Sequence, residues 1–181
     1  MELKDYVEQT LEEWRGRLYR TIDDLTPDEL VWQPNAEANP IGFIVWHVAR
    51  IEDGWAHRFG TDTEEVWTRD GWHIKLSLPE SDHGAGYTPE QVASFHTPSL
   101  GDLKAYLDDV RKDMLEYIRG LESPDFDVVP GRYPFAGSPS STGSYFTSFS
   151  VGRMFRQLNG ELYQHLGHIG YLRGLIRGHN Q

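Results

Sequence analysis

No cysteine occurs among the 181 residues. Disulfide bonds, thiolate nucleophiles and cysteine-based zinc or iron–sulfur sites are therefore excluded, which leaves imidazole and carboxylate groups as the strong metal ligands. The sequence also lacks an apolar run approaching the ~18 residues that a membrane-spanning helix needs, and residues 1–5 contain no apolar signal core. These absences predict a cytoplasmic protein that makes no membrane contact.

Positive charge is scarce as well, with 17 Lys and Arg against 28 Asp and Glu and a formal net charge of −11. Binding to nucleic acid or to an anionic membrane surface needs a concentrated basic surface, which this balance disfavours. We therefore expect a small-molecule substrate and no nucleic-acid partner. The length fits one domain, residues 1–181, that buries a core without disulfide bonds.

Four long segments carry apolar residues at steps of three and four. They span residues 3–25, 40–59, 99–121 and 151–177, and they predict an all-α fold, a four-helix bundle with long connecting loops. Residues 60–98 are expected to form a long ordered loop with one capped turn at 88–91. Residues 123–150, with a Gly/Ser cluster at 137–144, are expected to form a surface loop. Loops of this length are usually functional or cover a site.

The last predicted helix contains three side chains that can bind a metal: Glu161, His165 and His168. Residues three or four positions apart share one helix face. His165 falls within the apolar arc, where both ring nitrogens need partners; either a metal with a hydrogen-bond acceptor or ordinary core contacts would supply them. For an isolated histidine, core contacts are the better explanation. Glu161 beside it makes the two alternatives about equal, because a carboxylate next to an apolar stripe needs a cation, water or an arginine.

His47, at the edge of the apolar stripe of residues 40–59, is the candidate ligand from a facing helix. Taken alone, His47 is better explained as a polar edge to that stripe. Two histidines and one carboxylate leave open coordination positions, which is typical of catalytic metal sites. Zinc fits this donor set well, and nickel, iron and manganese are alternatives.

Other polar residues carry weaker predictions. Arg153 and Arg156, near the start of the last helix, are expected either to hold a substrate carboxylate or to be surface arginines. Glu52 and Asp53 are predicted to lie on a solvated helix face. Five histidines show no ligand spacing and are expected to be mostly solvated: His57, His73, His83, His96 and His179. Trp46, Trp67 and Trp72 are expected either in the core or over a pocket.

Three short motifs, in this order and spacing, resemble the DinB-like superfamily of four-helix metalloproteins. They are Trp32-Gln33-Pro34, Asn39-Pro40-Ile41-Gly42 leading into Trp46-His47-Val48, and Glu161-x-x-x-His165-x-Gly-His168 followed by Tyr171-Leu172-Arg173. Within that superfamily, the chain is similar to the branch containing the N-terminal domain of mycothiol-dependent maleylpyruvate isomerase. The resemblance implies that His47, Glu161 and His165 bind a divalent metal, with His168 as nearby support. Many relatives have histidine where this chain has Glu161, and the glutamate is associated with low-molecular-weight thiol chemistry.

The leading hypothesis is a metal-dependent transferase in which the ion activates a low-molecular-weight thiol, such as mycothiol or bacillithiol, toward a small electrophile. A chain without cysteine suits a borrowed thiol. A metal-dependent hydrolase is one alternative, and a non-catalytic, metal-stabilised helical module or dimerisation domain is another. Because relatives often dimerise, a homodimer is expected.

Overall fold

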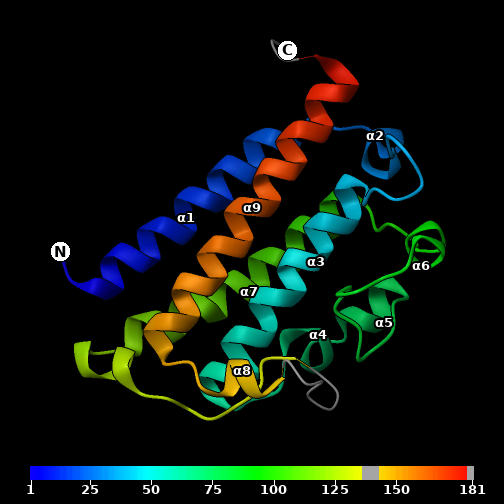
Figure 1. Cartoon of the computed structure of the whole chain (residues 1–181). Helices are drawn as coiled ribbons and strands as arrows, with labels where there is room; N and C mark the ends of the chain where they lie inside the picture. The colour runs from blue at the N-terminus through cyan, green and yellow to red at the C-terminus, as the bar shows by residue number, and fades with distance from the viewer. Residues whose placement is uncertain (136–142, 179–181) are drawn as a thin grey trace.

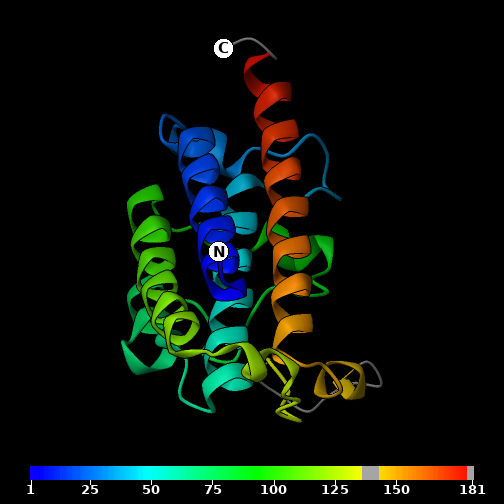
Figure 2. The same cartoon turned by 90° about the vertical axis from the view of Figure 1, so that its left-hand side faces the viewer.

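The computed structural model describes residues 1–135 and 143–178. Four long helices run through it: α1 (Leu3–Ile22), α3 (Ile41–Gly54), α7 (Leu100–Gly120) and α9 (Val151–Arg177). Figures 1 and 2 show them lying side by side as a bundle. No strand occurs among the described residues, so the predicted all-α class is confirmed. Most of the predicted Gly/Ser loop at 137–144 lies outside the described residues, and so does His179.

Helix α3, here called the central helix because other elements surround it, contacts α7, α9 and shorter elements of the connecting loops. Thirteen of its fourteen residues are buried, and the exception is His47. The outer helices α1, α7 and α9 instead bury one apolar stripe each, as their periodicity predicts. Ser99 and Ser150 begin α7 and α9 by accepting hydrogen bonds from the backbone N–H groups of Asp102 and Arg153. A surrounded helix thus presents a single accessible side chain.

The second long helix differs from the prediction for residues 40–59 because its geometry changes at Gly54. The chain continues as a π-helical segment, η1 (Trp55–Thr61), and leaves it through Asp62 in the left-handed conformation at φ 58°. A Cβ atom at Gly54 would lie only 2.1 Å from the carbonyl oxygen of Pro134. The glycine therefore allows the 123–135 connection to pass close to the central helix.

The loops contain short helices that periodicity does not predict. They are α2 (Pro27–Val31), α4 (Val66–Arg69), α5 (Trp72–Leu76), α6 (Pro89–Ala93), η2 (Ser123–Asp127) and α8 (Gly143–Thr147). The predicted capped turn at 88–91 is confirmed, since the Thr88 hydroxyl accepts from the Gln91 backbone N–H. Trp46, Trp67 and Trp72 are buried in the core. Among the described residues, no helix combines the length and apolar character that crossing a membrane requires.

The prediction that Glu52 and Asp53 face solvent is wrong, because both are completely buried. Glu52 forms a two-point ion pair with Arg111 of α7, at 2.6 and 2.7 Å. The two oxygens of Asp53 accept from the backbone N–H groups of Val66 and Trp67, both at 2.9 Å, and so hold the start of α4. Charges on α3 therefore act as internal cross-links, since the neighbouring elements exclude water from all sides of this helix.

Candidate metal site and its surroundings

His47 is held in one orientation by the backbone of a neighbouring loop. Its Nδ1 atom lies 2.5 Å from the carbonyl oxygen of His83. A carbonyl can only accept, so Nδ1 carries the proton and Nε2 keeps its lone pair. Burial lowers the pKa of His47, which favours the neutral ring. A metal-binding histidine has this arrangement, with one nitrogen donating to a backbone carbonyl and the other free to coordinate.

A close packing contact and two hydrogen bonds fix the loop that carries this carbonyl. Gly84, at φ +77°, has no room for a side chain, because a Cβ atom would lie 2.7 Å from Trp46 and 3.2 Å from His47 Nδ1. The Asp82 carboxylate accepts from the Gly84 N–H at 3.0 Å, and Arg50 Nε donates to the Asp82 carbonyl at 2.9 Å. The conformation of residues 82–84 therefore fixes the ring of His47.

His165 of α9 packs edge-on against His47, with ring centroids 5.2 Å apart and an interplanar angle of 80°. Its Nδ1 atom is buried and makes no hydrogen bond within the described part of the chain. Burial, together with the rings of His47 and His168, lowers the pKa of His165 to about 4. The ring is therefore neutral at physiological pH. A buried nitrogen without a partner is costly, and a metal ligand is one arrangement that would relieve that cost.

Glu161 lies one helical turn before His165. One carboxylate oxygen, Oε2, is 3.8 Å from His165 Nε2, too far for a hydrogen bond. The other, Oε1, accepts from Gln157 Nε2 at 2.9 Å. No arginine pairs with Glu161 within the described residues, and its side chain is 36% exposed, so water and a cation are the remaining alternatives that the sequence left open. The carboxylate therefore keeps one oxygen free on the side of His165.

The three predicted ligands meet in pairs, His47 with His165 and His165 with Glu161. Across residues 1–135 and 143–178, no group of three His, Asp or Glu side chains forms a ready metal cluster. His168 lies one turn further along α9, with its ring centroid 5.6 Å from that of His165. The donor types fit a metal. An ion shared with Glu161 would bind His165 Nε2, the nitrogen nearest that carboxylate, and would leave the buried Nδ1 for another partner. His47, Glu161 and His165 remain predicted ligands.

His57 is a second histidine whose surroundings the sequence did not predict. It is buried rather than solvated, and its Nδ1 and Nε2 atoms lie 2.8 Å from Asp53 Oδ1 and 3.2 Å from Asp113 Oδ2. Burial alone would lower the pKa of His57, but the hydrogen bond and charge of Asp53, with help from Asp113, raise it. These contacts therefore favour the charged form of the ring, which lies between carboxylates of α3 and α7.

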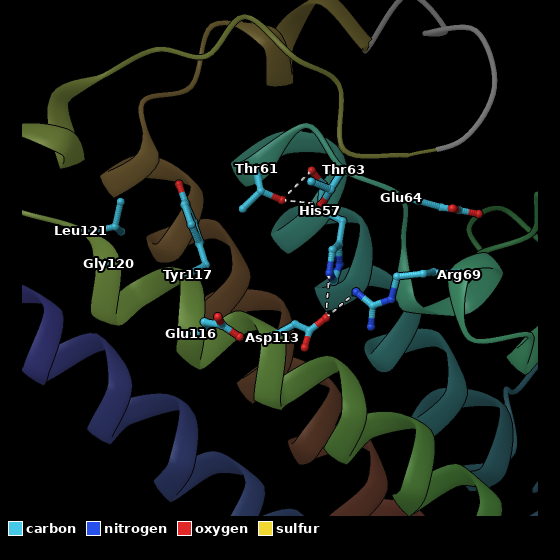
Figure 3. A pocket seen from close by; sticks show the side chains of 10 residues that line it. All are labelled: His57, Thr61, Thr63, Glu64, Arg69, Asp113, Glu116, Tyr117, Gly120 and Leu121. Atoms are coloured by element: carbon cyan, nitrogen blue, oxygen red, sulfur yellow. Dashed lines mark hydrogen bonds and ion pairs between the residues drawn. The ribbon is translucent and has the colours of Figure 1, made fainter.

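Figure 3 shows that His57, Asp113 and Arg69 border a pocket of about 590 Å³. Arg69 Nη1 donates to the Asp113 carboxylate at 2.7 Å, on the side away from the protein core. The polar atoms of this cluster therefore bind one another. We interpret the cluster of His57, Arg69 and Asp113 as a structural ion-pair network that joins η1, α4 and α7.

Arg153 and Arg156 do not form a joint anion site in the described structure. The Arg153 guanidinium lies 4.1 Å from the centre of the Phe149 ring and donates to the Tyr145 hydroxyl at 2.8 Å. Arg156 is exposed and lines a different pocket, about 490 Å³ in volume, beside α1. This placement favours the alternative of surface arginines.

Comparisons with known proteins agree with this architecture. A family model described as the DinB superfamily matches residues 10–169. A crystal structure of a conserved protein from Enterococcus faecalis has a similar fold, with a TM-score of 0.79, 19% sequence identity, and coverage of 98% of this chain and 99% of that one. A cysteine–tRNA ligase from Burkholderia vietnamiensis is 34% identical over 62 residues, which span 32% of this chain and 12% of that enzyme.

Proposed function

Because the chain belongs to the DinB superfamily, we propose that it binds one divalent metal through His47, Glu161 and His165 and transfers a low-molecular-weight thiol to a small electrophile. The observation that carries this proposal is the pair of neutral imidazoles packed together from two facing helices, 5.2 Å between ring centroids. Glu161 supplies the carboxylate of a His, His, carboxylate donor set. Zinc suits these donors well, and nickel is the main alternative.

Each residue has a defined part in this proposal. The carbonyl of His83 holds the proton of His47 on Nδ1, so that Nε2 keeps the lone pair that a metal ligand needs. Glu161 brings the negative charge that offsets the cation, and Gln157 orients it through one oxygen. A divalent metal held by these donors would lower the pKa of a bound thiol and so favour the nucleophilic thiolate. Since the chain has no cysteine, the thiol has to come from a cofactor such as mycothiol or bacillithiol.

The first test is metal content and affinity. Protein purified without a histidine tag or chelator is examined by elemental analysis and then titrated with zinc and nickel. We expect about one equivalent per chain. His47→Ala, Glu161→Ala and His165→Ala should each lose it, and His96→Ala, an exposed histidine outside the site, should retain it. A folded protein that takes up neither metal would overturn the proposal.

The second test separates thiol transfer from its alternatives. Cobalt(II) replaces the native ion, and 2-mercaptoethanol is added while the absorption spectrum is recorded. A new sulfur-to-cobalt charge-transfer band supports thiol binding at the metal. Hydrolysis of p-nitrophenyl acetate without such a band would favour a metal-dependent hydrolase. A metal that raises the melting temperature while neither reagent responds would indicate a non-catalytic, metal-stabilised module.

A further inference from the structure

A pocket of about 460 Å³ lies beside the candidate metal site, between residues 34–39, α3 and the C-terminal half of α9. Ile44 and Leu172 form its buried wall, and Tyr171 and Leu175 form its rim, where they are 64% and 48% exposed. Its volume is within the range of roughly 300–1,000 Å³ typical of small-molecule sites. The pocket thus has the size and apolar lining of a ligand site.

The lining also carries no formal charge. None of the described residues that line it is Asp, Glu, Lys or Arg, although 25% of the chain consists of these residues. A charged ligand would lose hydration on entering and would find no opposite charge in return. The pocket therefore selects for an uncharged molecule.

Two exposed polar side chains at this pocket are available to hydrogen-bond a ligand in place of water. Asn39 and His168 both line it, and neither makes a side-chain hydrogen bond to another described residue. A side-chain amide offers both donors and an acceptor, and an imidazole ring offers at least one donor. Together they match a ligand group that also donates and accepts, such as a carboxamide. A few such groups on an apolar wall are what orient a bound small molecule.

We propose that this pocket binds a small uncharged molecule with an apolar body and a carboxamide-like polar end. His165 connects the pocket to the candidate metal site, because it lines the pocket and packs against His47. The occupant would then be the electrophile, or the part of it that is recognised. That assignment rests on the proposed function, whereas binding to the pocket does not.

The test uses three fluorinated probes of similar shape: 4-fluorobenzamide, 4-fluorobenzoate and 4-fluorobenzylamine. Fluorine NMR of the full chain, with a chelator present, measures their affinities in the absence of metal. We expect the amide to bind at least about tenfold more tightly than either charged probe. Ala38→Phe fills the pocket and should abolish this preference. Ala36→Phe, on the exposed part of the same loop and outside the lining, is the matched control.

Leu175→Glu is a second variant, at an exposed rim position where folding is not at risk. It should weaken amide binding and admit 4-fluorobenzylamine. The proposal is overturned if a charged probe binds more tightly to the unmodified protein, or if Ala38→Phe and Ala36→Phe bind the amide equally. It is also overturned if sedimentation shows that Ala38→Phe alone breaks a dimer, because a second copy would then cover the pocket.

The two proposals fail separately. Amide binding in a protein that takes up no metal supports the pocket and refutes the metal site. Metal binding without any response to the probes refutes only the pocket.

Discussion

Replacing Glu52 by Gln tests how strongly a buried ion pair holds the bundle together. The two Glu52 oxygens accept from Arg111 at 2.6 and 2.7 Å, and both side chains have 0% exposure. Arg111 also donates to the backbone carbonyl of Leu11. One guanidinium therefore joins α1, α3 and α7. Glu52 is its buried counter-charge, and Glu12, 34% exposed and 3.5 Å away, is a weaker second partner.

The expected loss of stability is large. Glu52→Gln leaves the Arg111 cation buried beside a neutral amide, and removing one partner of a buried pair costs about 3–5 kcal/mol. This is a large part of the ~5–15 kcal/mol that stabilises a typical folded protein. Replacing both partners, as in Glu52→Leu with Arg111→Met, leaves no unpaired charge and should cost far less than the two single changes added together.

Urea unfolding, followed by tryptophan fluorescence and circular dichroism, gives the free energy of unfolding by linear extrapolation. Glu13→Gln is the matched control, because Glu13 pairs with Arg17 at the same distance of 2.6 Å while the two side chains are 57% and 54% exposed. It should cost no more than about 1 kcal/mol. Two results would contradict this expectation. One is a loss of unfolding free energy in Glu52→Gln no larger than that in Glu13→Gln. The other is a loss in the double replacement equal to the sum of the losses in the two single variants.

Three further changes test the structure around the site. Gly84→Ala should cost at least about 1 kcal/mol more than Gly86→Ala, because both glycines have positive φ but only Gly84 lacks space for a Cβ atom; it should also weaken zinc binding, as calorimetry would show. His57→Gln should lower the free energy of unfolding most below pH ~6.5, and the loss should shrink as pH rises through the raised folded-state pKa of His57. The reason is that the ring attracts Asp53 and Asp113 most strongly while it is protonated. Urea unfolding from pH 5.5 to 9 measures this dependence. Asp53→Ala should cost about 3 kcal/mol or more and increase amide hydrogen exchange in α4, because the N–H groups of Val66 and Trp67 lose their acceptor.

The sequence predicts the helices better than their surroundings. The apolar periodicity of the outer helices is decisive because each has one solvent face, and their observed bounds lie within a few residues of the predicted ones. The same reasoning fails on α3, where Glu52 and Asp53 resemble a solvent face and are buried. Glu52 pairs with Arg111, which lies on α7, and Asp53 pairs with Arg50 at a spacing of three residues that is equally typical of exposed helix pairs. The burial of these pairs therefore follows from tertiary packing and not from the local sequence pattern.

The candidate site shows the same division. The spacing of Glu161 and His165 on one helix predicts their proximity, and in the structure Glu161 Oε2 lies 3.8 Å from His165 Nε2. The carbonyl of His83, in contrast, leaves no mark on the sequence, because any residue could supply it. A glycine after a histidine, in a loop with several glycines, is the only local signal, and it becomes informative once the close approach of Gly84 to Trp46 and His47 is known.

Arg50 connects the stability of the core to the geometry of the candidate site. Inside the bundle, the Arg50 guanidinium forms ion pairs with Asp53 and Glu65, each at 3.1 Å. The same guanidinium also donates a hydrogen bond from Nε to the Asp82 carbonyl. Asp82 begins the loop segment that ends in Gly84 and places the His83 carbonyl on His47. Because His47 is the one residue of α3 that is not fully buried, the ionic core orients the only side chain through which the central helix reaches the candidate site.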